Sequence, residues 1–377
     1  MTRRLYLLRH GTPEFPECGP YVYGRTDYPL SELGKEDAEN LGEFLQAELK
    51  RPFTVYTSPL KRARDTANPL IRLRDDANEP IIITNFAEFD MGTWDGKRLA
   101  DLGSADLENL KLLFSDPEKF VPAGGETLQE AQARFADAMF DVLSKDSKDV
   151  VVFAHAAVNI LFLSYLGHAS LAELQKIIQP YGCYNIFKIE GTTLVPEVIG
   201  GMPTKAPSKA RIELLRDSYK MSQFDREHAD GVAEIAMSLY DLLKTTEEIK
   251  LDPDVLYAAA KLHDLRREAP KHALAGQRTL EFEGYPEVAK VIGNHTDLPA
   301  KHRTKITESS LVFLADKAIL GDKPVGIEMR FRGLTGAVDD DKYYKKSKKR
   351  RDAAYEVLAT LSKYVDKEHI LQVIGGA

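Results

Sequence analysis

A change of pattern near residue 200 limits the folds that this chain can adopt. Before that point, short β-rich apolar runs alternate with longer amphipathic segments, whereas helical periodicity prevails after about residue 212. Such alternation predicts an α/β sandwich with a largely parallel sheet in the first half. The second half is predicted to be all-α. With 377 residues, the chain is long enough for two domains that each bury a core.

We predict one domain at residues 1–200, a linker at 201–219 that begins with Gly, Pro and polar residues, and a helical domain at 220–377. The strands expected in the first domain are Arg4–Leu8, Thr54–Thr57, Ile81–Thr84, Val150–Phe153, Tyr184–Glu190 and Thr193–Val198. The expected helices are Glu32–Leu49, a helix starting at Ser58-Pro59 with Ser58 as its N-cap, Leu128–Leu143, and one that follows the strand Val150–Phe153 and ends at about Leu166.

Composition excludes several classes of function. The net charge of −7 argues against general nucleic-acid binding, although it allows a local basic pocket for a small phosphate. Two cysteines are too few for a disulfide framework or a four-sulfur zinc site. The first apolar run is too short for a signal peptide, and no apolar stretch approaches the roughly 18 residues of a membrane span. We expect a cytoplasmic protein without a membrane partner.

Several residues suited to phosphoryl transfer follow predicted strands in the first half. Arg9 and His10 come directly after the first strand, Arg62 lies just past the second, and His155 follows Val150–Phe153. Histidine can attack phosphorus, and the arginine fork makes bidentate contacts with phosphate oxygens. Because open α/β sheets bind ligands at the carboxyl ends of their strands, these groups are expected to meet there. Each residue alone is more often structural.

The order of these motifs resembles the histidine phosphatase superfamily, whose fold is phosphoglycerate-mutase-like. The resemblance covers about residues 1–200. The matching segments are Leu7-Leu8-Arg9-His10-Gly11-Thr12, Gly24 to Gly34, Thr57 to Ala67, the loop Glu88 to Gly96, Gly124-Gly125-Glu126-Thr127, and Phe153-Ala154-His155.

This resemblance implies a role for each matching residue. His10 would be the phosphorylated nucleophile, Arg9, Arg62 and His155 would hold the phosphoryl oxygens, and Glu88 would protonate the leaving group. Arg25, within the second motif, would contact the substrate. The resemblance implies no metal for this domain. Pro13-Glu14-Phe15-Pro16 stands where many members carry an asparagine that touches the phosphate. The domain is short, which favours hydrolysis over phosphoryl mutation.

A second set of potential ligands lies in the helical half. His228 shares an apolar helix stripe with Val232, Ile235 and Leu239, and His263-Asp264 ends an apolar helix. Asp316 lies inside the run Leu311 to Ala318, where a carboxylate is costly unless it is paired or bound to a metal. Imidazole and carboxylate together suit iron, manganese or zinc.

The pattern of His228, His263-Asp264 and Asp316 resembles the HD-domain phosphohydrolase superfamily, over about residues 220–322. His272 and His295 add a likeness to the subgroup with two metals. That likeness implies one divalent metal on His228, His263 and Asp316, a second on His272 and His295, and Asp264 as the bridge. Arg267, three residues after Asp264, would grip a phosphate. The basic stretch Lys342–Arg351 is either a solvated helix face or an anion-binding rim.

Two hypotheses follow. In the first, the chain is a bifunctional phosphohydrolase of small-molecule phosphate esters, and its helical domain hydrolyses a phosphate ester, such as a nucleotide, with a metal-activated hydroxide. In the alternative, the helical domain is a nucleotide-sensing regulatory module without catalysis. The six filled ligand positions favour the first hypothesis, because a decayed metal site would have lost some of them.

Overall fold

The computed structural model describes residues 3–17, 19–332 and 342–376. The chain divides into two compact units, Met1–Pro203 and Thr204–Ala377, which are described separately below. The division falls inside the stretch predicted as a linker.

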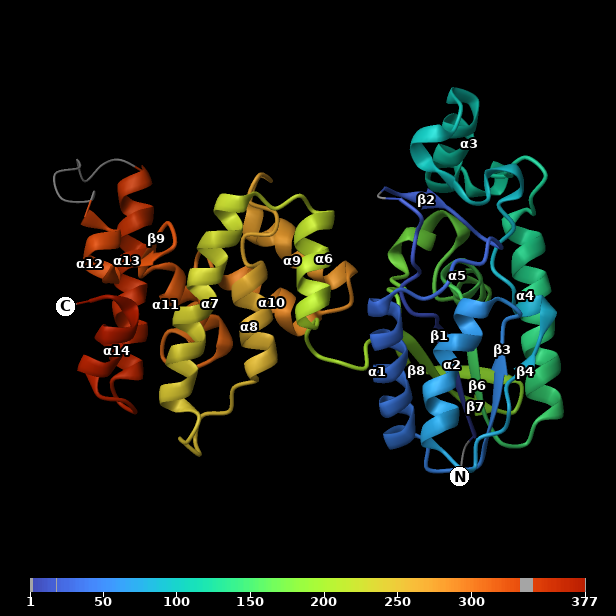
Figure 1. The fold of residues 1–377 in the computed structure, drawn as a ribbon, viewed down its shortest axis with the longest axis horizontal. Helices are drawn as coiled ribbons and strands as arrows, with labels where there is room; N and C mark the ends of the chain where they lie inside the picture. The colour runs from blue at the N-terminus through green and yellow to red at the C-terminus, as the bar shows by residue number, and fades with distance from the viewer. Residues whose placement is uncertain (1–2, 18, 333–341, 377) are drawn as a thin grey trace. The chain divides into compact units, whose positions relative to one another are not determined.

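A six-stranded sheet organises the first unit, in the order β4-β3-β6-β1-β7-β8 (Figure 1). The four strands from β4 to β1 run parallel, and β7 and β8 close the sheet as an antiparallel pair. The sheet strands are β1 (Arg3–Arg9), β3 (Phe53–Thr57), β4 (Ile81–Ile82), β6 (Asp149–Ala154), β7 (Tyr184–Glu190) and β8 (Thr193–Gly201); β2 (Tyr21–Val22) and β5 (Lys97–Arg98) form a separate small pair.

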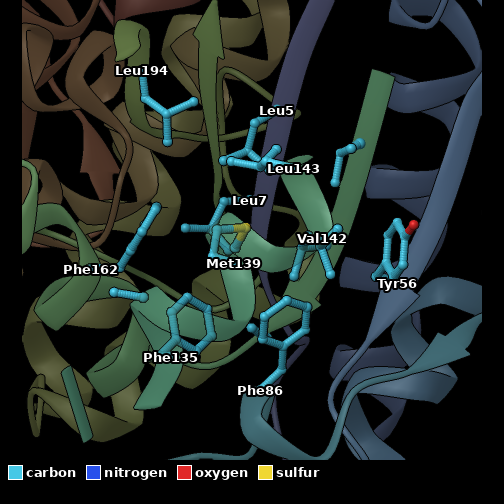
Figure 2. Packing of buried hydrophobic residues seen from close by; sticks show 14 of the residues in the cluster. Leu5, Leu7, Tyr56, Phe86, Phe135, Met139, Val142, Leu143, Phe162 and Leu194 are labelled. Carbon is cyan, nitrogen blue, oxygen red and sulfur yellow. The ribbon is translucent and has the colours of Figure 1, made fainter. Parts of the chain in front are cut away.

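Helices cover both faces of this sheet, because its central strands are apolar on both sides. The helices are α1 (Glu32–Glu48), α2 (Lys61–Leu73), α3 (Ser104–Ser115), α4 (Leu128–Lys145) and α5 (Ala156–Tyr165). Leu41 of α1 and Leu70 of α2 belong to one buried cluster with strand residues, whereas Phe135 of α4 and Phe162 of α5 belong to another (Figure 2). The result is the predicted α/β sandwich with a largely parallel sheet.

Two predicted elements of this unit differ from the structure. Helix α2 begins at Lys61 after the N-cap Leu60, and not at Ser58-Pro59. The Ser58 amide instead extends the sheet hydrogen bonding by donating to the Phe153 carbonyl, and its hydroxyl contacts His155. The predicted strand Ile81–Thr84 is only two residues long, because a 3₁₀ turn begins at Thr84.

The second unit is mainly helical. Its helices are α6 (Lys209–Ser218), α7 (Gln223–Leu243), α8 (Pro253–Leu262), α9 (His272–Phe282), α10 (Pro286–Asn294), α11 (Glu308–Asp316), α12 (Gly326–Arg330), α13 (Lys342–Leu361) and α14 (Lys367–Ile374), with one short pair of strands, β9 (Ile319–Leu320) and β10 (Lys323–Pro324). Buried apolar residues such as Leu256, Val288 and Phe313 hold the bundle together.

Part of the stretch predicted as a linker is helical. Helix α6 starts at the N-cap Ser208, whose side chain accepts a hydrogen bond from the Arg211 amide. Ile212 and Leu215 are buried, so this helix packs as part of the second unit. Turn-forming residues are confined to the stretch before Ser208. No described helix in residues 3–332 or 342–376 combines the length and the apolar character needed to span a membrane.

The buried cluster in Figure 2 predicts a large loss of stability when Phe135 is replaced by alanine. Phe135→Ala should lower the free energy of unfolding of the first unit by about 3–5 kcal/mol, because the truncation leaves a cavity. Urea unfolding can be followed through Trp94, the only tryptophan in the chain. Phe114→Ala is the control, since Phe114 is 63% exposed. Equal midpoints for the two variants would contradict this account of the core.

Candidate functional site

The carboxyl edge of the parallel sheet gathers the residues that the sequence separates. Arg9 ends β1 beside Ala154 of β6, and β3 ends beside Phe153 of the same strand. His10 and His155 therefore lie side by side, with ring centroids 5.1 Å apart. Arg62 reaches the same point from the first turn of α2, with its Nε 3.2 Å from the Nε2 of His10.

The hydrogen bonds of His10 define its tautomer. Its Nδ1 lies 2.7 Å from the carbonyl oxygen of Gly11, which can only accept a hydrogen bond, so Nδ1 carries the proton. Nε2 accepts from Arg62 and thus presents its lone pair. Burial, Arg62 and Arg9 together hold the pKa of His10 well below its ordinary value. The ring is therefore neutral at neutral pH, which is the form that can attack phosphorus.

Arg62 is a fully buried cation, and its ion pair with Asp27 is long. Its guanidinium donates to the carbonyls of Thr26 (2.8 Å) and Gly24, while the nearest Asp27 oxygen is 3.5 Å away. Arg9 donates to the Gln179 carbonyl, and its guanidinium lies 3.7 Å from the centre of the Tyr181 ring. Carbonyl groups and aromatic rings compensate the positive charge of these two guanidinium groups only in part. The pair is therefore suited to bind an anion.

His155 is oriented by Ser58, a contact that the sequence did not predict. The Ser58 hydroxyl lies 2.6 Å from His155 Nε2, and the other ring nitrogen, Nδ1, is buried without a hydrogen-bond partner among the described residues. Burial and the neighbouring Arg62 hold the pKa of His155 well below its ordinary value. The Ser-Pro pair indicated a helix cap, so its sequence gave no sign of this role.

Glu88 is held at the amino end of α5. Its carboxylate accepts from the amides of Ala157 (3.1 Å), Val158 (3.1 Å) and Phe89 (2.9 Å). The first turn of a helix attracts a negative charge, because its amides are unpaired and its dipole is positive there. Helix α5 starts directly after His155, so both side chains are placed by the same strand-to-helix junction.

The loop that carries Glu88 is anchored by a network of ion pairs. Arg134 binds Glu126 at 2.7 Å and donates to the carbonyls of Asn85 and Ala87. Arg25, predicted to contact the substrate, pairs with Asp90 at 2.8 Å and lies 3.5 Å from Glu126. The structure thus places Arg25 in this supporting network.

Close packing of the backbone requires glycine at position 11. A Cβ on Gly11 would lie 2.3 Å from the carbonyl oxygen of Gly34. The segment that follows β1 therefore packs against the start of α1, and the Gly11 amide donates to Thr66 of α2 at 3.0 Å. The glycine brings these two helices close to His10.

A second cluster forms in the helical unit, around Asp264. His272 and His295 place their Nε2 atoms 3.4 and 3.5 Å from Asp264 Oδ1, and His263 Nε2 lies 3.6 Å from Oδ2. Among the described residues, two groups could each hold a metal ion: His228, His263 and Asp264, and Asp264, His272 and His295. Asp264 is common to both, as a bridging carboxylate would be.

Backbone carbonyls orient three of these histidines in the same way. Nδ1 of His228, His263 and His295 lies 2.7–2.8 Å from the carbonyl of Gly321, Ala260 and Ile292, respectively. Each Nδ1 therefore carries the proton, and each Nε2 lone pair faces the cluster. This is the arrangement that metal-ligating histidines adopt, with a second partner fixing the tautomer.

The protonation states of His263 and Asp264 also suit a metal. Burial lowers the pKa of His263 to about 4, so the ring is neutral. Although burial opposes it, His263 and His295 hold the pKa of Asp264 well below its usual range, so this carboxylate is ionised. His263 Nε2 and Asp264 Oδ1 are buried without hydrogen-bond partners in the described part of the chain. A divalent cation fits these unsatisfied donor atoms.

Asp316 and Arg267 lie at the margin of this cluster. Asp316 Oδ1 lies 3.3 Å from His228 Nε2, and Asp316 is paired with the buried Lys317. It is in neither of the two groups of potential ligands. Arg267 binds Asp264 Oδ2 at 2.9 Å and is more than half exposed. Arg350 from the basic stretch of α13 pairs with Asp297 at 2.8 Å.

Comparison with known proteins agrees with this geometry. A model of the histidine phosphatase superfamily (branch 1) matches residues 5–199, and a model of the HD domain matches residues 226–319. The chain belongs to the histidine phosphatase superfamily and carries an HD domain as a second unit. Both are families of hydrolases that act on phosphate esters.

Relatives match the first unit. A metal-independent phosphoserine phosphatase of Arabidopsis thaliana is 30% identical over 156 residues, 41% of this chain and 64% of that protein. A 2,3-bisphosphoglycerate-dependent phosphoglycerate mutase of Gloeobacter violaceus is 27% identical over 46% of this chain and 80% of its own length. The solved structure of YhfR from Bacillus stearothermophilus is 25% identical, with a TM-score of 0.48 over 52% of this chain and 96% of its own.

The environment of His10 predicts that its ring stays neutral below the ordinary pKa of 6.5. At about pH 5.5, NMR of the histidine rings should show His10 as the Nδ1–H neutral tautomer, with the signal assigned through a His10→Asn variant. Since the unfolded ring binds a proton at higher pH than the folded one, the first unit should lose stability as the pH falls below 6.5. Titration of His10 near pH 6.5 would refute this.

Proposed function

We propose that this chain is a bifunctional phosphohydrolase with two independent sites for phosphate esters. One observation carries the proposal for the first unit. The lone pair of His10 Nε2 points to a buried guanidinium, Arg62, at the edge of the sheet where Arg9 and His155 also converge. A phosphoryl group placed there would meet a nucleophile on one side and cations around its oxygens.

The proposed reaction of the first unit proceeds in two transfers. His10 Nε2 attacks phosphorus, the bond from phosphorus to the ester oxygen breaks, and Glu88 supplies the proton that the departing alcohol needs. Water then attacks the phosphohistidine, Glu88 accepts its proton, and inorganic phosphate leaves as the P–N bond breaks. Arg9, Arg62 and His155 hold the phosphoryl oxygens through both transfers.

Hydrolysis without a metal is the activity we assign to this unit. The Arabidopsis relative is named a metal-independent phosphoserine phosphatase, and the arginines around His10 supply positive charge without a metal ion. The substrate is proposed to be a small-molecule phosphomonoester. Transfer to a second substrate position, as in a mutase, is not proposed, because the domain is as short as in the phosphatase branch.

In the second unit, we propose hydrolysis of a phosphate ester, such as a nucleotide. His228, His263, Asp264, His272 and His295 would hold one or two divalent ions of iron, manganese or zinc, with Asp316 beside them. Such ions supply a Lewis acid and an activated water. The protein's own part is to orient the imidazoles, and Arg267, at the exposed rim, is proposed to bind the phosphate of the substrate.

Two variants should separate the two activities. His10→Ala should reduce hydrolysis of phosphomonoesters in the presence of EDTA by about 10³-fold or more, because the nucleophile is lost. It should leave the activity that EDTA abolishes unchanged. His263→Ala should have the opposite effect. The measurement is phosphate release from a panel of sugar phosphates, amino-acid phosphates and nucleotides, with and without EDTA.

The two outcomes that contradict the proposal differ in meaning. If both activities vanish in His10→Ala while Trp94 fluorescence shows the first unit folded, the sites are not independent. If no nucleotide or other ester is hydrolysed in an EDTA-sensitive way, yet a nucleotide binds to the second unit and alters the EDTA-resistant activity, this unit is a regulatory module.

Metal content tests the second site without any substrate. Elemental analysis of the purified chain should find one or two equivalents of iron, manganese or zinc. Asp264→Asn should lose most of the metal, because both ligand groups share Asp264, whereas His272→Ala should affect only one group. His369→Ala is the control, since His369 is exposed on α14. Equal metal content in Asp264→Asn and His369→Ala would exclude this centre.

A further inference from the structure

Five aromatic side chains of the first unit gather beside the phosphate-binding arginines. They form what we call the aromatic patch: Phe15, Tyr21, Tyr23, Tyr28 and Tyr181. Phe15 lies at its centre, stacked on Tyr21 at 5.1 Å and edge-to-face with Tyr23 and Tyr28 at 5.2 Å each. The first four follow His10 within one segment of the chain, and Tyr181 comes from the turn before β7.

The patch continues directly from the proposed reaction centre. The Tyr181 ring lies 5.7 Å from the His10 ring and faces the Arg9 guanidinium at 3.7 Å. The Tyr23 ring faces the Arg62 guanidinium at 5.3 Å, and its hydroxyl lies 2.6 Å from the Tyr181 hydroxyl. The arginines that would hold a phosphoryl group thus rest on the inner rings of the patch.

The rings of the aromatic patch are more exposed than the aromatic rings of a hydrophobic core. All five are only partly buried, whereas Phe89 and Trp94, from the loop Glu88 to Gly96, are each 1% exposed. Aromatic rings that serve only to fill a core are covered on every side. Ring surface that remains accessible next to a reaction centre is available to a ligand.

Residues 21–28, which carry three of the patch rings, are held by other parts of the unit. Both carboxylate oxygens of Asp95 accept backbone N–H groups, at 2.8 Å each, from Gly24, Arg25 and Thr26. Strand β2 pairs Tyr21 with Arg98 of β5, and the Tyr28 hydroxyl donates to the Gly96 carbonyl. A surface fixed in this way loses little conformational entropy when a ligand binds.

We propose that the aromatic patch binds a flat aromatic ring in the alcohol part of the substrate, so that the first unit prefers phosphomonoesters of aromatic alcohols. This inference rests on the proposed phosphatase function of the same site and names its substrate class. Stacked and edge-to-face contacts with Phe15, Tyr21 and Tyr23 favour a planar ring over a saturated ring of the same size. The base of a nucleoside monophosphate is one such ring.

A matched pair of substrates isolates this preference. Benzyl phosphate and cyclohexylmethyl phosphate both release a primary alcohol of similar size, but only benzyl phosphate carries an aromatic ring. For the full-length chain in EDTA, kcat/KM should be about tenfold higher for benzyl phosphate, since aromatic contacts of this kind are worth roughly one factor of ten. A ratio at or below one would overturn the proposal.

Variants test whether the patch causes the preference. Phe15→Leu and Tyr21→Leu keep apolar bulk but remove an aromatic face, so each should bring the benzyl to cyclohexylmethyl ratio toward one. Comparing the ratio between variants cancels the intrinsic reactivity of the two esters. Phe114→Leu, on α3 and 63% exposed, is the matched control and should keep the wild-type ratio. A ratio that survives in both patch variants would exclude the patch as its cause.

This experiment separates the two levels of inference. If the wild-type chain hydrolyses neither ester nor any other phosphomonoester in EDTA, the phosphatase function itself fails. If it hydrolyses both esters with equal kcat/KM and His10→Ala abolishes both, the phosphatase function stands and the aromatic preference fails. Unfolding followed through Trp94 establishes that each variant is folded.

Discussion

The contact between Arg62 and His10 organises the first unit's site. A guanidinium with no exposed surface donates to the imidazole nitrogen that is proposed to attack phosphorus. This hydrogen bond, together with the Gly11 carbonyl on the other ring nitrogen, leaves His10 only one tautomer. The ion pair of this buried charge with Asp27 is long, at 3.5 Å, so an anionic phosphoryl group would complete its interactions. The burial of Arg62 beside His10 thus favours both the neutral form of the proposed nucleophile and the binding of an anion.

The second unit also orients histidines through backbone carbonyls, but the charge at its centre is negative. Backbone carbonyls again hold the Nδ1–H of three histidines and direct Nε2 inward, but the centre now contains the buried carboxylate of Asp264. Imidazoles oriented in this way around an ionised carboxylate suit a metal cation. The two units would therefore meet a phosphate ester differently. The first would bind it with its own arginines, and the second through a metal.

Sequence reasoning reached the main architecture because its signals are local. Apolar runs and helical periodicity predicted most strands and helices of the first unit to within one or two residues, including β1, α4 and β6. Predictions were wrong where residues typical of a helix cap or a linker have a different structural role. Ser58 looked like a helix cap but contacts His155, and half of the expected linker became α6 because Ile212 and Leu215 are buried.

The candidate catalytic and metal-binding residues could be identified from the sequence by their residue types and their order along the chain. Arg9, His10, Arg62, Glu88 and His155, and the histidines and aspartates of the second unit, could be named from motifs alone. Tertiary structure alone decided their tautomers, their pKa shifts and their partners, because these depend on carbonyls and charges far away in the chain. The same holds for the aromatic patch, whose rings at positions 15–28 and 181 meet only after β1 and β7 have paired.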